Sequence, residues 1–143
     1  MITGKFDIAM KPLDMTVQGS KGNTLGRMSI DKTFYGPLSA TSVGEMLSVR
    51  TSVEGSAGYV AIEQVTGELE GKKGSFVLQH YGIMDVNGQQ LTLEVVPDSG
   101  SGELKHLLGK MQIRIDNGQH FYDFDYALNN ALNDALNDAL NNA

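Results

Sequence analysis

The chain has no cysteine among its 143 residues. Disulfide bonds, thiolate nucleophiles and cysteine metal ligands are therefore excluded, and the absence fits a reducing compartment. The amino terminus carries Lys5 and Asp7 before any long apolar run forms, so it lacks the pattern of a secretory signal peptide. No segment approaches the roughly 20 apolar residues that cross a bilayer as a helix. We expect a cytoplasmic protein with no membrane partner.

Basic residues are scarce as well. The 11 Lys and Arg residues are outnumbered by 17 Asp and Glu residues, which gives a formal net charge of −6. The densest basic pair is Lys72–Lys73, and it lies in an expected turn. Because nucleic-acid backbones are bound mainly by clustered cations, we expect no nucleic-acid partner.

The motifs of common cofactor sites are also missing. The three histidines, His80, His106 and His120, have no metal-ligand spacing. The glycine-rich segments 55–58 and 100–102 lack the Lys-Ser/Thr ending of a P-loop and the spacing of a dinucleotide fingerprint. We therefore expect no metal and no cofactor.

The sequence does contain many short segments in which apolar and polar residues alternate, as in Phe6, Ile8 and Met10. The 17 glycines suit frequent turns, and Asn87–Gly88 and Asn117–Gly118 are strong hairpin signals. We count about eight strands joined by short turns. An all-β fold follows, and an antiparallel up-and-down β-barrel over residues 1–126 would leave no exposed strand edge.

Two central segments, 59–66 and 75–84, are apolar on both faces. Strands of this kind are usually covered on two sides. In a barrel, one face fills the interior and the other packs on something else, such as another subunit. This pattern predicts a homo-oligomer.

Residues 127–143 have a different composition from the rest of the chain. They repeat Ala-Leu-Asn-Asn/Asp with a period of four, which a strand cannot produce. One interpretation is low-complexity sequence produced by repeat expansion. The other is a helix, marginal by itself because Asn is a poor helix former, that docks its leucines on the outer wall or on a neighbouring chain.

The strand segments together resemble a known group of sequences. The resemblance rests on five segments: 25–34, 40–47, 54–63, 74–80 and 96–100. They are similar to DUF3224, a family of uncharacterised bacterial proteins, over residues 3–126. The resemblance implies an eight-stranded antiparallel barrel of the allene oxide cyclase-like type around an elongated apolar cavity. It implies no activity, and the tail lies outside it.

Charged residues in apolar strand positions are the first site candidates. Lys32 shares a face with Ile30 and Phe34, and Glu63 lies between apolar neighbours. A buried charge is costly unless it is paired, so one interpretation is an ion pair between Lys32 and Glu63, or of either with Arg114. The other is that one of them orients a polar group of a ligand in an apolar pocket.

His80, Gln79 and Tyr59 complete the predicted site. His80 is either a hydrogen-bonded core residue or a proton carrier in the cavity. Gln79 suits ligand recognition or a buried network, and Tyr59 is expected to pack rather than react. Because Gln79 and His80 are adjacent in a strand, only one of them can line the interior.

Three functions are consistent with these residues. The first is binding of a small hydrophobic molecule, with Lys32, Tyr59, Glu63, Gln79 and His80 as ligand-binding candidates. The second is a cyclase or isomerase that acts on an unsaturated substrate by holding it in a reactive conformation. Glu63 and His80 are its catalytic candidates. The third is a structural or oligomer-forming protein.

Overall fold

The computed structural model describes residues 1–128, which form strands connected by turns and no helix. The strands are β1 (Ile2–Leu13), β2 (Thr24–Tyr35), β3 (Leu38–Arg50), β4 (Ala57–Leu69), β5 (Lys72–Asp85), β6 (Gly88–Val95), β7 (Ser101–Gly102), β8 (Leu108–Asp116) and β9 (Gln119–Ala127). The all-β prediction is confirmed.

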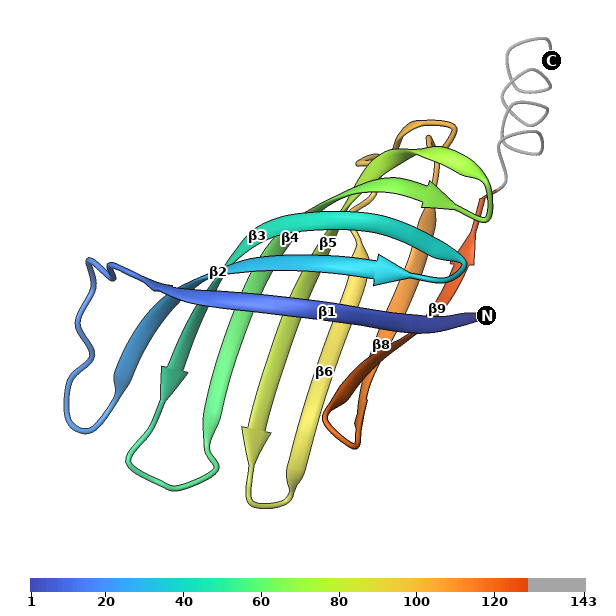
Figure 1. Ribbon diagram of the computed structural model, residues 1–143. Coiled ribbons are helices and arrows are strands. Elements are labelled where there is room, and N and C mark those ends of the chain that lie inside the picture. The colour runs from blue at the N-terminus through green and yellow to red at the C-terminus, as the bar shows by residue number, and fades with distance from the viewer. Residues whose placement is uncertain (129–143) are drawn as a thin grey trace, which may run out of the picture.

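The long strands close into one antiparallel barrel (Figure 1). Each pairs with its neighbours along the chain in the order β4-β3-β2-β1-β9-β8-β6-β5, and β4–β5 pairing completes the ring. The two-residue strand β7 lies outside this ring and pairs with β5. The predicted eight-stranded barrel and its consecutive strand order are therefore confirmed.

The hairpin turns lie where the sequence placed them. Asn117 and Gly118 have φ angles of 50° and 77°, which suits a tight turn between β8 and β9. Gly88, with φ of 130°, begins β6 directly after the turn from β5. These positive φ angles explain why Asn117, Gly118 and Gly88 stand at their positions.

One end of the barrel is filled by large side chains. The connection between β7 and β8 places Leu104 and Leu107 over this end, and both are fully buried. They belong to a single core cluster with inward-facing residues of the strands, among them Leu38, Leu69, Phe76, Leu78, Tyr122 and Phe124. We call this the closed end.

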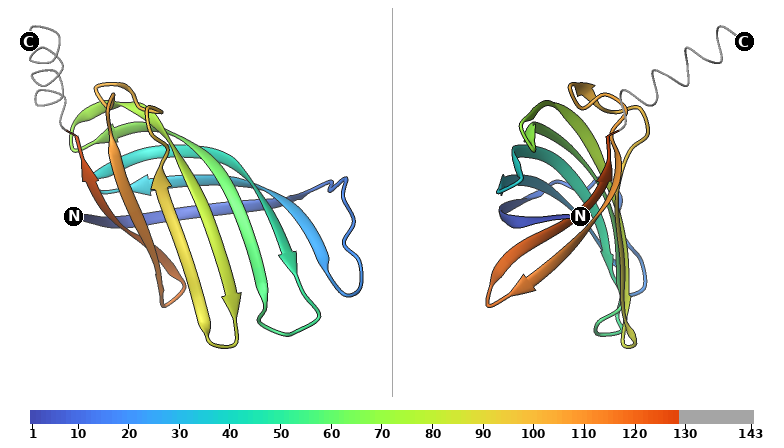
Figure 2. Two further views of the ribbon diagram at one scale, coloured as in Figure 1. Left: turned by 180° about the vertical axis from the view of Figure 1, so that it is seen from behind. Right: turned by 90° about the vertical axis from the view of Figure 1, so that its right-hand side faces the viewer.

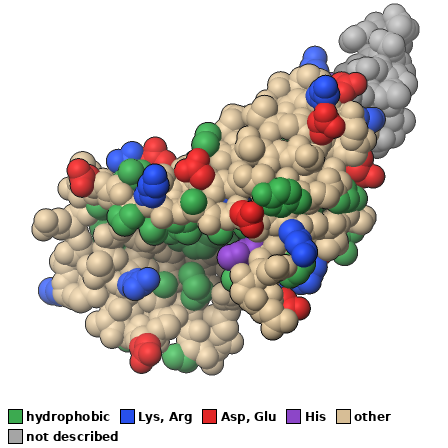
Figure 3. Space-filling model, in the orientation of Figure 1, with side chains coloured by type: hydrophobic (Ala, Val, Ile, Leu, Met, Phe, Trp, Pro, Cys, Tyr) green, Lys and Arg blue, Asp and Glu red, His purple; other side chains and the backbone are tan. Residues whose placement is uncertain are grey.

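The opposite end is open because two strand pairs separate there. Pairing of β1 with β9 stops at Phe6 and His120, although β1 continues to Leu13, and β6 pairs with β8 at two positions. Figure 2 shows the β8–β9 hairpin diverging from β5 and β6. In Figure 3 the face below β1 is hollowed, and hydrophobic side chains line the hollow.

The inner face near this open end is apolar and partly exposed. Its residues follow the inward alternation of the buried ones and include Met28, Met46, Tyr59, Met84 and Leu91. Three of them are methionines, whose flexible thioether side chains adapt to irregular surfaces. We call these five residues the open-end wall.

The outer faces of the two central strands differ from the expectation. Val60 and Ile62 on β4 are 49% and 51% exposed, and Tyr81 and Ile83 on β5 are 49% and 45% exposed. The prediction that these strands are covered on two sides is therefore not met within residues 1–128. Coverage by a second chain stays a prediction.

The carboxyl-terminal strand continues through Ala127, one residue beyond the predicted end of the barrel. Leu128 packs, partly buried, against the core cluster. The rest of the predicted helical tail lies outside the described residues. Within residues 1–128, no helix has the length and apolarity to span a bilayer.

Candidate functional site: a buried polar chain that ends at the open end

Polar side chains from four consecutive strands meet inside the barrel. Lys32 on β2, Ser42 on β3, Glu63 on β4 and His80 on β5 are at most 4% exposed. Strand alternation points each of them inward. The register then brings them together, because Lys32 pairs with Ser42 and His80 pairs with Ala61, two residues from Glu63.

Glu63 is the centre of this cluster. The Lys32 ammonium lies 3.0 Å from Oε2 and 3.3 Å from Oε1 of its carboxylate. The Ser42 hydroxyl donates to Oε2 at 3.0 Å, and Nε2 of His80 lies 3.2 Å from Oε1. Three donors thus satisfy a carboxylate that has no exposed surface, which is the condition for burying a charge.

Lys32 is enclosed by aromatic rings on its other side. Its ammonium lies 5.0 Å from the ring centre of Phe6 and 5.7 Å from that of Phe34. Cations are attracted to ring faces, so both rings help to stabilise the charge away from water. Glu63 and the two rings therefore stabilise the buried ammonium.

The pKa of the Glu63 carboxyl lies below its usual value. Burial alone would raise it, but the His80 hydrogen bond and the positive charge of Lys32 outweigh that effect. Glu63 is thus an ionised acceptor and a poor proton acceptor. Since it is also inaccessible, it can act on a bound molecule only through His80 or through its charge.

Tyr59 extends the cluster toward the open end. Its hydroxyl lies 3.4 Å from Nδ1 of His80, and the two rings meet edge to face at 6.1 Å. When His80 donates from Nε2 to Glu63, Nδ1 is the acceptor for the Tyr59 hydroxyl. A single chain of hydrogen bonds then runs from Lys32 through Glu63 and His80 to Tyr59.

The Tyr59 ring packs closely against the backbone of β5. Gly82 is its cross-strand partner, and a Cβ atom there would lie 2.4 Å from the ring. Glycine at this position is therefore needed for the ring to turn its hydroxyl toward His80. Burial and the negative charge of Glu63 raise the pKa of Tyr59 to about 12, so the phenol stays protonated near neutral pH.

Four of the five predicted ligand-binding residues belong to this chain of hydrogen bonds. The Lys32–Glu63 ion pair in it is one of the two interpretations that the sequence left open for these two residues. Gln79 does not join them. It lies on the outer face and lines a shallow groove of about 200 Å³ with Tyr81 and Glu94. Arg114, the alternative partner, instead pairs with Asp123 on the surface at 2.6 Å.

Ser42 is the site residue that the sequence analysis missed. It lies on the face of β3 that carries small side chains, between Ala40 and Gly44. A small-residue face signals close approach of another element. The hydroxyl within that face was the available sign that a polar group approaches there.

Comparison with known proteins places the chain in a family. The family model for DUF3224, a protein family of unknown function, matches residues 2–126. The chain belongs to the DUF3224 family. A crystal structure of a DUF3224 protein with unknown function from Shewanella oneidensis MR-1 has 59% sequence identity and a TM-score of 0.87, and the match covers 89% of this chain and 95% of that one. None of the curated proteins matches the chain.

The predicted DUF3224 membership is therefore confirmed. Because the function of the family is unknown, membership assigns no activity to this chain. The allene oxide cyclase-like type of barrel stays a prediction. Within residues 1–128 of this DUF3224 protein, no group of three or more His, Cys, Asp or Glu residues could hold a metal ion.

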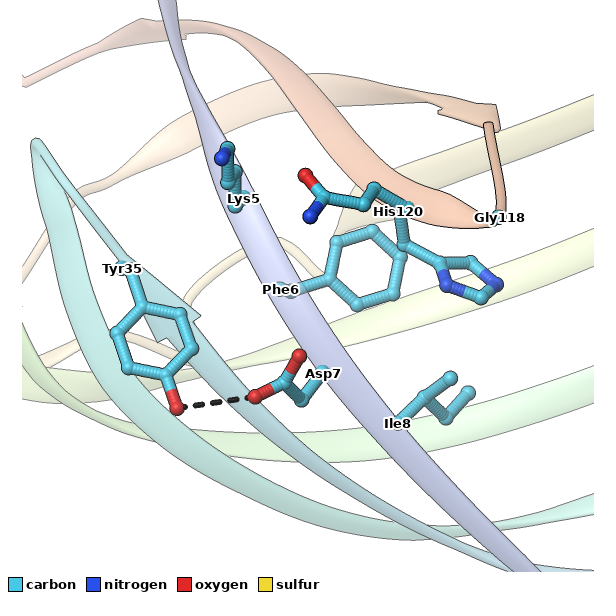
Figure 4. A pocket seen from close by; sticks show the side chains of 8 residues that line it. Lys5, Phe6, Asp7, Ile8, Tyr35, Gly118 and His120 are labelled. Atoms are coloured by element: carbon cyan, nitrogen blue, oxygen red, sulfur yellow. Dashed lines mark hydrogen bonds between the residues drawn. The ribbon is translucent and has the colours of Figure 1, made fainter. Parts of the chain in front are cut away.

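A second hollow of this DUF3224 protein lies where β1 and β9 separate (Figure 4). It has a volume of about 350 Å³, and its lining includes Phe6, Ile8 and His120. The Phe6 and His120 rings are 5.2 Å apart. Phe6 also lies next to Lys32, so its ring contacts both this hollow and the buried polar chain.

Acid should weaken the folded state of this DUF3224 protein through Glu63. Since the pKa of Glu63 is lower in the folded state than its ordinary value of 4.5, its contribution to stability is fully present above about pH 4.5. That contribution is lost as pH falls below 4.5 through the lower folded-state pKa. Urea unfolding from pH 7 to pH 3 should show this decline in the free energy of unfolding.

Asp123, whose pKa is also lowered by the Arg114 hydrogen bond, acts in the same pH range. Its side chain is 12% exposed and that of its partner Arg114 is 50% exposed, so added salt should weaken this pair more than the fully buried Glu63 cluster. A Glu63→Gln variant that keeps the full acid decline in high salt would contradict the assignment to Glu63.

Proposed function

We propose that this DUF3224 protein binds a small, mostly apolar molecule at the open end of the barrel. The observation that carries the proposal is the Lys32–Glu63–His80 chain, which ends at the half-buried hydroxyl of Tyr59. Ligand sites are typically apolar hollows with a few placed polar groups. The open-end wall supplies the apolar surface, and Tyr59 supplies the polar group.

The energetics of the cluster support a role beyond stability. Replacing a buried ion pair by apolar residues of similar volume is often neutral or stabilising by about 1–4 kcal/mol. A cluster of Lys32, Glu63 and His80 is therefore a costly way to fill an interior. Fixing the tautomer of His80, and through it the orientation of Tyr59, is a reason to keep it.

The methionines of the open-end wall support an adaptable site. Met28 and Met46 are cross-strand partners on β2 and β3, and Met84 lies on β5, two residues from Gly82. Such side chains repack around ligands of different shape. The proposal is therefore a class of apolar molecules of similar size.

Native mass spectrometry of the protein purified from cells tests this function directly. We expect a retained small molecule in the wild type, and a smaller retained fraction in Tyr59→Phe. Tyr81→Phe is the matched control, because Tyr81 is half exposed on the outer face. Absence of retained molecules, together with no thermal shift in an apolar metabolite screen, would overturn the proposal.

A second candidate is catalysis by the same residues as a cyclase or isomerase. The His80–Tyr59 pair favours it, since a protonated phenol can polarise a substrate oxygen. The predicted resemblance to allene oxide cyclase barrels is consistent with it. Glu63 and His80, the predicted catalytic residues, then act as positioning groups behind Tyr59. Conversion of unsaturated substrates should fall with His80→Phe by much more than ligand retention does.

A third candidate is self-association through the outer face of β3, β4 and β5. Register places Leu47, Val60 and Tyr81 in one row across these strands, and they are 45%, 49% and 49% exposed. Glu45 beside the row is paired with Arg27, which leaves the surface without net charge in an acidic chain. A second copy of this chain suits such a surface because no like charges oppose it.

Light scattering of the full chain tests self-association. We expect an oligomer in the wild type and monomers in Val60→Lys. A chain shortened after Leu128 separates the role of the outer face from that of the repeats. Monomeric wild-type protein at high concentration would overturn this candidate.

A further inference from the structure

We propose that the polar end of the bound molecule is an uncharged hydrogen-bond acceptor, such as a carbonyl or hydroxyl oxygen, which Tyr59 holds at the inner end of the site. This inference rests on the proposed function and specifies its ligand class. Its consequence is that the site rejects carboxylates at this position.

Accessibility leaves Tyr59 as the contact point of the cluster. The side chains of Lys32 and Glu63 are 2% and 0% exposed, and His80 is 4% exposed. Tyr59 alone among these four residues is partly exposed, and it belongs to the open-end wall. A molecule that enters from the open end therefore meets the phenol first.

The Lys32 ammonium, the cation of the cluster, already has Glu63 as its counter-ion. Both oxygens of Glu63 lie within 3.3 Å of the Lys32 ammonium, and the Phe6 and Phe34 rings cover its other side. Lys32 cannot serve as the counter-ion of a ligand without leaving Glu63 buried and unpaired, which is strongly unfavourable. The inner end of the site thus offers no free positive charge among the described residues.

The local field also disfavours an anion. Burial and, after it, the negative charge of Glu63 raise the pKa of Tyr59 and so oppose ionisation of the phenol. The same field opposes a ligand carboxylate placed against the Tyr59 hydroxyl. Such a carboxylate would lose its hydration without gaining a cation, which costs more than burying a neutral oxygen.

The donor arrangement fits a neutral acceptor. When a ligand oxygen approaches, the Tyr59 hydroxyl can turn its proton from Nδ1 of His80 to that oxygen. No charge is created by this change, because the hydroxyl only exchanges one acceptor for another. The close fit of the ring against Gly82 keeps the hydroxyl oxygen in place while its proton turns.

Isothermal titration with four matched probes tests the ligand class: methyl decanoate, decanol, decanoate and decane, with their dodecyl homologues. At neutral pH we expect methyl decanoate and decanol to bind about tenfold tighter than decane, as one hydrogen bond contributes. Decanoate should bind at least about tenfold more weakly than methyl decanoate.

Variants separate the proposed contact from simple partitioning into an apolar surface. Tyr59→Phe should reduce the affinity for methyl decanoate to that for decane, whereas Tyr81→Phe should leave it unchanged. Decanoate binding as tightly as methyl decanoate would overturn the inference while leaving the proposed function intact. Failure of every probe, decane included, would instead overturn the proposed function.

Discussion

Glu63→Gln should destabilise the protein by about 3–5 kcal/mol, the cost of removing one partner of a buried ion pair. The amide can still accept from His80, but it leaves the Lys32 ammonium without an anion in a site that is 2% exposed. Natural domains unfold with only about 5–15 kcal/mol, so this loss is a large fraction of the total. Urea unfolding at pH 7 measures it.

A second substitution identifies the cause. In the double variant Lys32→Met with Glu63→Gln, the buried charge is gone and the hydrogen bonds of Ser42 and His80 remain possible. We expect this variant to recover most of the lost stability, because replacement of both charges avoids an unpaired ion. If it is no more stable than Glu63→Gln alone, the unpaired charge of Lys32 is not the reason for the loss.

The matched control is Glu45→Gln on the outer face of the neighbouring strand. Glu45 is also paired, with Arg27, but both side chains are substantially exposed. Exposed pairs contribute about 0–1 kcal/mol, so the same chemical change should have a small effect there. The contrast isolates burial as the origin of the large effect at Glu63.

The position of Lys32 could be predicted from its own strand, whereas the network around Glu63 could not. Alternation puts Lys32 on the face of Ile30 and Phe34, and this face is the inner one. The three donors to Glu63 lie 31, 21 and 17 residues away along the chain. Their meeting depends on the register between strands, which periodicity within one strand does not contain.

The sequence did not decide which face of β4 and β5 points inward, for a different reason. Both faces of these strands carry apolar residues, so hydrophobicity does not choose between them. The choice of His80 over Gln79 follows from the donors and acceptors inside, since His80 can bridge Glu63 and Tyr59. The apolar outer face that resulted is the surface for which self-association is proposed.

The role of Tyr122 could not be predicted from the local sequence pattern either. Alternation with His120 and Phe124 placed it in a strand. Its hydroxyl, however, accepts from the amide of Leu38 at 3.0 Å and donates to the carbonyl of Tyr35 at 2.7 Å, more than 80 residues away along the chain. Gly4 makes room for this contact, because a Cβ there would lie 2.3 Å from the hydroxyl. Tyr122 thus ties the β2–β3 hairpin to β9.

Tyr122→Phe should therefore cost about 1–3 kcal/mol, although it removes a single oxygen atom. The amide of Leu38, a residue with no exposed surface, would lose its partner, and a buried unsatisfied donor costs that much. Thermal unfolding should show a midpoint lowered by about 4 °C for each kcal/mol. Amide hydrogen exchange at Leu38 should become faster, because its protection depends on this bond.

Tyr126→Phe is the control for this substitution. Its hydroxyl bonds to the exposed carboxylate of Glu70, so water can replace it. We expect a change within about 0.5 kcal/mol, as for most surface substitutions. Equal effects of the two variants would mean that the hydroxyl of Tyr122 contributes no more to stability than an exposed one, and that only its ring matters. A loss confined to Tyr122→Phe would show that one hydroxyl joins the β2–β3 hairpin to β9 at the closed end of the barrel.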